Sequence, residues 1–289
     1  MDDMRYEAPA TLDAAVALLA SADGDVRVMA GGTDVLVQLH CDMIEPDLLV
    51  DIKYIPDVRA ISEQNGVWRV GAAVTGMELM ENDAFCAAWP GVIDGAKLIG
   101  SIQIKGRATL GGNVCNASPG ADSPPALMAA GAIATIIGPK GRREVPVEDI
   151  AIAPGKTSLT KGEIIVSFTL PKPAPHSGSA YLRFIPRTEM DIAVVGVGIG
   201  LTLDDGGTCT AARVALGAVA PRALLVEEAA ATLIGTKLDD AALANLAAAC
   251  SAACRPIDDK RGTKEFRIKI AGVLSTRVAK IALDRARAN

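Results

Sequence analysis

A proline-rich segment at residues 171–178 divides the sequence into two parts with different patterns of elements. It reads Pro-Lys-Pro-Ala-Pro-His-Ser-Gly, and stiff prolines beside small polar residues are typical of a domain boundary. Before it, short predicted strands and helices alternate, whereas after it a run of strands precedes a run of helices. The 289 residues, 50% of them apolar, suffice for one large or two ordinary domains. We therefore expect two domains, residues 1–173 and residues 178–289.

The second part has the pattern of an α+β domain. Strands are predicted at residues 180–185, 192–203 and 211–220, and helices near residues 222–234, 240–254 and 263–287. This order favours a small antiparallel sheet with helices laid on one side. Gly196, Gly198 and Gly200 alternate within the second strand, but Leu201 stands where a dinucleotide fingerprint needs its last glycine. We therefore predict that these glycines permit close packing.

In the first part, helix-capping residues and glycines mark where the predicted helices and strands begin or end. Thr11 is a predicted cap for an apolar helix, and Thr75 and Glu78 have capping-box spacing. Strands are predicted at residues 26–30, 48–52, 67–74, 132–137 and 163–170, and helices near residues 92–99 and 123–131. The first strand leads directly into a glycine turn and then into a short helix. This order of elements matters for the site.

Two glycine loops are the most informative local feature. Gly31-Gly32 lies between a predicted strand and a helix start, and Gly111-Gly112 lies in a second loop. Glycine permits positive φ and lets a phosphate approach, so each loop can present main-chain N–H groups to an anion. One such pair is usually only a turn, but two of them favour a pyrophosphate site. Arg27, Lys105 and Arg107 precede the loops and either offset the phosphate charge or are ordinary solvated charges.

Composition disfavours several other functions. The net charge of −5 and the scattered basic residues give no footprint for nucleic acid, and 3% aromatic residues leave few rings for base stacking. The acidic start, Met1–Arg5, lacks the features of a signal peptide, so we expect a cytoplasmic protein. The longest uncharged run, residues 123–139, is broken by prolines and too short for a membrane span. Six dispersed cysteines and two histidines offer neither a metal site nor an acid/base pair.

The residues in and after the two loops form a recognisable combination. The stretches that carry it are Ala30-Gly31-Gly32-Thr33-Asp34, Thr109-Leu110-Gly111-Gly112-Asn113-Val114-Cys115-Asn116-Ala117-Ser118-Pro119, and Asp122. They resemble the FAD-binding, or medium, subunit of the molybdenum hydroxylases, the family of xanthine dehydrogenase and carbon monoxide dehydrogenase. The resemblance continues through residues 215–222 and 259–267, and therefore covers nearly the whole chain.

The resemblance implies an α+β fold with two domains. Residues 1–173 would form a two-lobed FAD-binding domain of the vanillyl-alcohol oxidase and p-cresol methylhydroxylase type. Residues 178–289 would form a smaller domain of the carbon monoxide dehydrogenase flavoprotein type, with a three-stranded antiparallel sheet and helices.

It also implies the cofactor contacts residue by residue. The pyrophosphate and the ribityl group of FAD would lie against positions of the two loops, namely Arg27, Val28, Met29, Ala30, Gly31, Gly32, Thr33, Asp34 and Val35, with Thr109, Leu110, Gly111, Gly112 and Asn113. Ile99, Gly100 and Ile165 match positions along the flavin ring. Asp122 matches a position that forms a hydrogen bond with the cofactor, and Arg183 one where relatives often have lysine. Valine at Gly32 or Gly111 is predicted to abolish flavin retention by blocking the phosphate.

Partners and reaction follow from the same resemblance. Hydroxylation at carbon would occur at a molybdenum cofactor in a large subunit, and electrons would leave through [2Fe-2S] clusters in a small subunit. This oxidoreductase subunit would pass them from FAD to an external acceptor such as NAD, oxygen or a quinone. A dimer of heterotrimers is expected, with no catalytic residue and no metal in this chain.

Two departures and two alternatives accompany this interpretation. Lys105-Gly106 stands where relatives commonly have Arg-Asn, and Ile99 where xanthine dehydrogenase has an aromatic residue. The cysteine-rich loop of benzoyl-CoA-type relatives has no counterpart, so no extra cluster is expected.

One alternative function is a self-sufficient flavin oxidoreductase, which the scarce histidines disfavour. The other is a scaffold without flavin, which the intact glycines disfavour.

Overall fold

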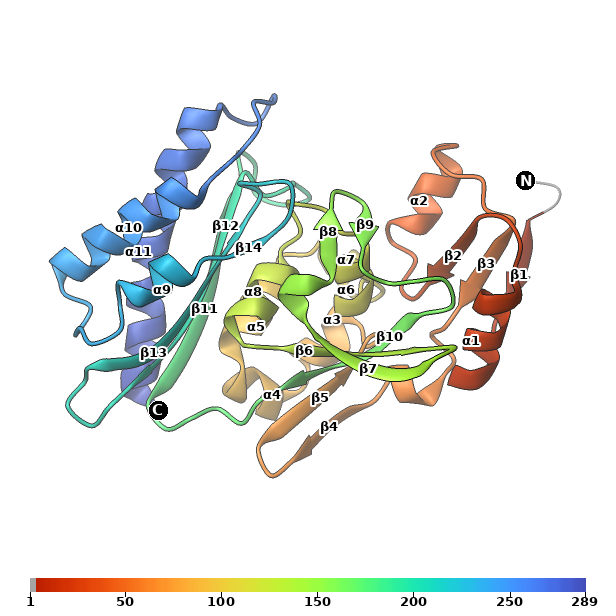
Figure 1. Cartoon of the computed structure of the whole chain (residues 1–289), viewed down its shortest axis with the longest axis horizontal. Coiled ribbons are helices and arrows are strands. Elements are labelled where there is room, and N and C mark those ends of the chain that lie inside the picture. The colour runs from red at the N-terminus through yellow and green to blue at the C-terminus, as the bar shows by residue number, and fades with distance from the viewer. Residues whose placement is uncertain (1–3) are drawn as a thin grey trace.

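Three parallel strands form one end of the molecule in the computed structural model, which describes residues 4–289 (Figure 1). Their order is β1 (Arg5–Glu7), β3 (Leu48–Asp51), β2 (Val26–Met29). The predicted cap of α1 (Leu12–Ser21) is confirmed, because Thr11 Oγ1 accepts a hydrogen bond from Ala14 N at 3.2 Å. Met1 to Asp3 of the acidic start lie outside the described residues.

A five-stranded antiparallel sheet occupies the middle of the molecule (Figure 1). Its order is β4 (Ile61–Gln64), β5 (Val67–Gly71), β10 (Ile164–Leu170), β6 (Ile133–Gly138), β7 (Gly141–Pro146). β10 is buried on both faces, since Ile164 and Val166 pack with α1 whereas Ile165 and Phe168 pack with the helices on the other side. A hairpin of β8 (Ala151–Ala153) and β9 (Lys156–Thr157) precedes β10.

Short helices connect these sheets. They are α2 (Val35–His40), α3 (Gly76–Met80), α4 (Asp83–Ala88), α5 (Pro90–Ala96), α6 (Ile102–Lys105), α7 (Leu110–Cys115) and α8 (Ser123–Ala129), with 3₁₀ turns at Pro56–Val58 and Val147–Asp149. The capping box of Thr75 and Glu78 is confirmed at α3. The second glycine loop is not a loop, because Gly111 and Gly112 form the first turn of α7 with Thr109 as its N-cap.

The carboxy-terminal elements form an antiparallel sheet covered by helices on its outer face (Figure 1). The strands are β11 (Ser177–Phe184), β12 (Val195–Leu203), β13 (Cys209–Gly217) and β14 (Leu224–Leu225), and the helices are α9 (Glu227–Ala231), α10 (Asp240–Ala253) and α11 (Lys264–Ala288). The predicted α+β class is confirmed, but the prediction of three strands was wrong. β14 lies in a stretch predicted as helical and pairs with β13.

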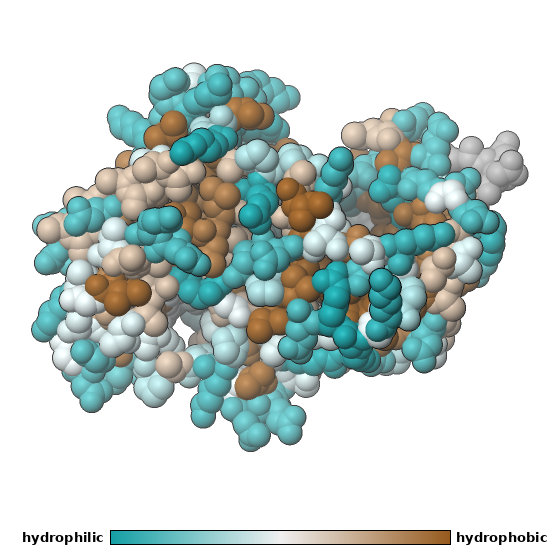
Figure 2. Space-filling view, in the orientation of Figure 1, coloured by the Kyte–Doolittle hydropathy of each residue, from teal (hydrophilic) through white to brown (hydrophobic). Residues whose placement is uncertain are grey.

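Helix α8 joins the two halves of the molecule. It packs on the inner face of the carboxy-terminal sheet, where a Cβ at Gly198 would lie 2.4 Å from Pro125 O and one at Gly200 2.4 Å from Ala129 O. The prediction that alternating glycines permit close packing is therefore confirmed. Figure 2 shows hydrophobic residues in separate groups among hydrophilic ones on one face of the molecule. Among residues 4–289, no helix has the length and apolar character needed to cross a membrane.

Candidate functional site

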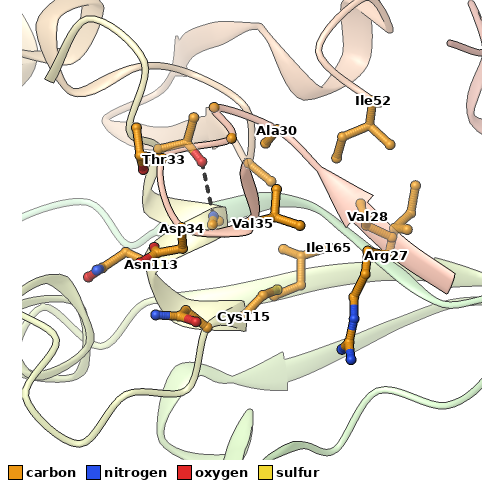
Figure 3. A pocket seen from close by; sticks show the side chains of 18 of the residues that line it. Arg27, Val28, Ala30, Thr33, Asp34, Val35, Ile52, Asn113, Cys115 and Ile165 are labelled. Atoms are coloured by element: carbon orange, nitrogen blue, oxygen red, sulfur yellow. Dashed lines mark hydrogen bonds between the residues drawn. The ribbon is translucent and has the colours of Figure 1, made fainter. Parts of the chain in front are cut away.

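A cleft opens where β2 ends, between the β2–α2 turn, the start of α7 and the start of β10. The carboxyl ends of parallel strands are a common place for ligands in sheets of this kind. Most residues predicted for the cofactor line this cleft (Figure 3): Arg27, Val28, Ala30, Gly31, Gly32, Thr33, Asp34, Val35, Ile99, Thr109, Gly111, Gly112, Asn113 and Ile165. Residues from four separate parts of the sequence thus meet at one place.

Five predicted residues do not line the cleft. Met29 and Leu110 are buried in the apolar core beneath the two turns, and Gly100 has φ +63° beside Ile104. The other two, Asp122 and Arg183, pair with each other at the N-terminal end of α8. Conversely, the cleft includes residues that the sequence did not indicate, namely Val26, Gln38, Ile52, Ala72, Ala108, Asn116, Leu159, Glu163 and Ile164, together with Cys115.

The first turn is held directly against the chain that leads into α7. A Cβ at Gly31 would lie 1.8 Å from Arg107 O, so only glycine fits there. Arg107 Nε also donates to Gly31 O at 3.2 Å. Gly32 has φ +81°, a conformation that other residues rarely adopt. The two glycine segments therefore converge through main-chain contact, as the sequence predicted.

The first turn also carries free main-chain donors. Within residues 4–289, no hydrogen bond uses the N–H groups of residues 31–35, and the first N–H with an intramolecular acceptor is Leu36 N, bonded to Gly32 O at 3.0 Å. Consecutive free N–H groups around a residue with positive φ form a concave anion-binding nest. With no acceptor inside the described part of the chain, such donors are free to bind water or an anion in the cleft.

The second glycine pair differs, because its N–H groups are already used by the protein. Gly111 N donates to Ala72 O at 3.1 Å, Gly112 N to Thr109 Oγ1 at 2.9 Å and Asn113 N to Thr109 O at 3.1 Å. The expectation that both loops present free amides was therefore wrong for this one. What it offers instead is the hydroxyl proton of Thr109 and the exposed Cα of Gly112, where a Cβ would meet only Thr109 Oγ1 at 3.1 Å.

The three predicted basic residues have different positions. Arg27 lines the cleft and pairs with Asp25 at 3.1 Å on the surface. Arg107 bonds to Gly31 O from outside the cleft. Lys105 is buried and its Nζ donates to Lys97 O at 2.6 Å, so neither of the two alternatives, a phosphate contact or a solvated surface charge, was right for this residue. Arg27 is therefore the cation that a ligand in the cleft meets.

Asp122 and Arg183 form a buried pair between the two halves of the molecule. Arg183 Nη1 donates to Asp122 Oδ2 at 2.6 Å, and the Tyr181 hydroxyl donates to Asp122 Oδ1 at 2.9 Å. Burial raises the pKa of Asp122 to about 6, while Arg183 and Tyr181 act in the opposite direction. The carboxylate is thus charged at neutral pH and committed to its neighbours. The cofactor contacts expected of Asp122 and Arg183 stay predictions.

The wall opposite the first turn comes from β10 and α7. In Figure 3 the Cys115 side chain points toward Ile165, and burial raises the pKa of this thiol to about 12, which keeps it neutral. Glu163 receives hydrogen bonds from Arg143 Nε at 2.7 Å and Nη2 at 2.8 Å, which hold its pKa at about 2. Residues 4–289 contain no group of three or more His, Cys, Asp or Glu side chains arranged to hold a metal. The wall is therefore mainly apolar, with one firmly ionised carboxylate.

This fold and cleft define an α+β protein whose cleft presents free main-chain N–H groups, a feature suited to an anionic ligand. The sequence matches the FAD binding domain in molybdopterin dehydrogenase over residues 2–173 and the CO dehydrogenase flavoprotein C-terminal domain over residues 180–282. The chain therefore belongs to the family of FAD-binding medium subunits of the molybdenum hydroxylases, a family of oxidoreductases.

Relatives match along their whole length. The carbon monoxide dehydrogenase medium chain of Afipia carboxidovorans is 34% identical, with 98% of this chain and 97% of that one covered. The xanthine dehydrogenase FAD-binding subunit of Escherichia coli O157:H7 is 33% identical, with 99% and 98% covered. Among solved structures, reconstituted CO dehydrogenase from Oligotropha carboxidovorans has a TM-score of 0.93 at 34% identity, and quinoline 2-oxidoreductase from Pseudomonas putida 86 has 0.90 at 30%, each covering 98% of both chains.

Proposed function

We propose that the cleft binds FAD with its pyrophosphate on the first turn. The free N–H groups of residues 31–35 carry this proposal, since a diphosphate supplies the acceptors that they lack. Thr109 Oγ1 and the exposed Cα of Gly112 face the same space, and Arg27 adds a positive charge at its edge. The residues present therefore fit the cofactor that the family binds.

The apolar wall suits the flavin ring. Ile99 and Ile165 line the cleft, and we assign them to the ring, with Gly100 shaping the chain beside Ile99. We place Asp122 and Arg183 behind this region, where their ion pair fixes β11 against the start of α8. In this arrangement they position the wall, and a cofactor contact would require one of them to turn toward the cleft.

The role that we infer is electron transfer within a larger complex. FAD, when bound, supplies the exchange between one-electron and two-electron steps. The chain binds and orients it. Of the titratable groups in the cleft, the Cys115 thiol is kept neutral by burial, Glu163 is held by Arg143, and Asp34, whose pKa is raised by burial, lies in the turn that we assign to the pyrophosphate. The partners would be a large molybdenum subunit and a small [2Fe-2S] subunit, in a dimer of heterotrimers that delivers electrons to an external acceptor.

We also propose the division of the chain into residues 1–173 and 178–289. The proline-rich segment between them supports it, and the two family matches end and begin at residues 173 and 180. Helix α8 of the first part packs against the sheet of the second part, so the two parts share an extensive contact.

The test is an absorption spectrum of the complex that co-purifies with this chain. We expect flavin and iron–sulfur absorption that bleaches when the matching substrate is added and returns with the physiological acceptor. The isolated chain should hold flavin and turn over no organic substrate. A flavin-free, fully assembled complex, or substrate turnover by the isolated chain, would contradict the proposal.

A further inference from the structure

A second pocket lies on the opposite side of the first turn from the FAD cleft. It has a cavity volume of about 280 Å³ and shares only Ala30 and Gly31 with that cleft. Its other lining residues are Lys53, Tyr54, Arg59, Ala73, Thr75, Gly106 and Arg107. Three of them are cations and none is an acid, so the lining carries an excess of positive charge.

Two of the cations are partly neutralised by acids outside the pocket. Lys53 Nζ pairs with the fully buried Asp51, and Arg59 pairs with Glu78 and donates to Ala73 O at 2.7 Å. Arg107 is different. Within residues 4–289 its only side-chain hydrogen bond runs from Nε to Gly31 O, which leaves Nη1 and Nη2 without an acceptor.

We propose that this pocket binds an oxyanion, a carboxylate or a phosphate, through Arg107, Lys53 and the Tyr54 hydroxyl. A guanidinium can give its Nη protons to an oxyanion while its Nε keeps a separate acceptor, so the ion and Gly31 O are held together. The ammonium of Lys53 retains protons beyond the one given to Asp51. Tyr54 is 61% exposed at the mouth, and its hydroxyl has no partner within the described part of the chain.

The consequence, which rests on the proposed FAD site, is a coupling between the two pockets. An ion that fixes the Arg107 guanidinium also fixes Gly31, and with it the turn that presents the free N–H groups. Oxyanion binding should therefore raise the affinity for FAD, which is seen as slower FAD release. Coupling between two binding equilibria is reciprocal, so bound FAD should raise the affinity for the oxyanion by the same factor as the oxyanion raises the affinity for FAD.

The experiment uses the full chain and inorganic phosphate, with chloride at equal ionic strength as the reference. Equilibrium dialysis of the FAD-loaded chain, in which the first turn is already occupied, measures phosphate binding, and the rise of flavin fluorescence measures FAD release. We expect saturable phosphate binding and about fivefold slower release in phosphate. Lys53→Gln and Tyr54→Glu should remove both effects, while Lys140→Gln, in an exposed turn, should retain both. Tyr54→Glu is the safer variant, because Lys53 also neutralises buried Asp51.

Measurements of FAD release from the assembled complex distinguish the two possible sources of the oxyanion. If a free ion is the ligand, phosphate slows FAD release in the complex as it does in the isolated chain. If a carboxylate of a partner subunit fills the pocket, release in the complex is already slow without phosphate, and Tyr54→Glu accelerates it. Phosphate binding that is absent, or equal in all variants, overturns the proposal. A chain that binds phosphate but takes up no FAD would instead refute the cofactor assignment.

Discussion

The two Gly-Gly pairs face the same cleft but have different structural roles. At the first pair the chain turns with free N–H groups, and Gly31 is required because Arg107 O lies against its Cα. At the second pair the chain is helical, the N–H groups are bonded within the protein, and Gly111 is required because Ala72 O lies against it. Of the four glycines, Gly112 is the exposed one, and a Cβ there would meet only one neighbouring atom, Thr109 Oγ1 at 3.1 Å.

The comparison shows that two copies of the Gly-Gly dipeptide at one site can have different functions. The first pair supplies hydrogen-bond donors, whereas the second supplies a surface without side chains and a capped helix start. A glycine required by its own protein contacts and a glycine required by a ligand respond differently to the same substitution. Substitution by alanine, the smallest change that adds a Cβ, separates the two cases.

Gly31→Ala should have the largest effect. Its Cβ would lie 1.8 Å from Arg107 O, so the two segments must move apart and the N–H groups lose their arrangement. We expect a destabilisation of about 1–3 kcal/mol or more and a loss of FAD affinity of about a hundredfold. Chemical unfolding and flavin titration measure both. Gly106→Ala is the matched control, since its Cβ would meet only Gln103 O at 3.4 Å; equal behaviour of the two variants would argue against contact between the segments.

Gly111→Ala and Gly112→Ala sharpen the comparison within the second pair. A Cβ at Gly111 would lie 2.5 Å from Ala72 O, so this variant should lose about 1–3 kcal/mol of stability. Gly112→Ala is in an exposed helical turn, so it should keep or gain stability, by up to about 1 kcal/mol. Its FAD affinity should nevertheless fall about tenfold. Normal flavin binding by a stable Gly112→Ala protein would remove the second pair from the cofactor site.

Local chemistry made part of this fold predictable. The caps at Thr11 and Thr75 each rest on a side-chain hydrogen bond within four residues, so the sequence alone indicates them. Short edge strands such as β4 and β7 have no such signal, because their exposed faces carry polar residues and only pairing defines them. The two-residue strand β14 was predicted as helix because it is too short to interrupt the helical pattern of α9, which begins two residues later at Glu227.

The part of the site that is built from glycine-dependent main-chain turns could be predicted from the sequence. The side chains that reach the site only through tertiary packing could not. Both glycine pairs were found in the sequence, and they do meet at one cleft. Glu163 reaches that cleft through β10, which no local pattern connects to the glycines. The two alternatives for Lys105 were a phosphate contact and a solvated surface charge, but burial directs its ammonium group to Lys97 O. The direction of a long side chain depends on packing that the sequence does not display.

The smallest effect should come from Glu163, which lies just before β10 and outside both glycine segments. In the folded protein Arg143 holds the pKa of Glu163 at about 2, below its ordinary value of 4.5. A depressed carboxyl pKa stabilises the folded state above pH 4.5, and this stabilisation is lost as the pH falls from there to about 2. In Arg143→Gln the free energy of unfolding should therefore fall less between pH 4.5 and pH 2 than it does in the unchanged protein. Flavin content at pH 7 should stay normal, because residues 31–35 and α7 are unchanged.

Urea unfolding at several pH values between 7 and 2 measures this contribution, which should be modest because the pair is partly exposed. Arg142→Gln is the matched control, since this neighbouring side chain is exposed and points to the other face of β7. An acid curve that is identical in the two variants would mean that Glu163 is not held by Arg143. Loss of flavin from Arg143→Gln at pH 7 would show that the β10 wall, and not only the glycine segments, determines cofactor retention.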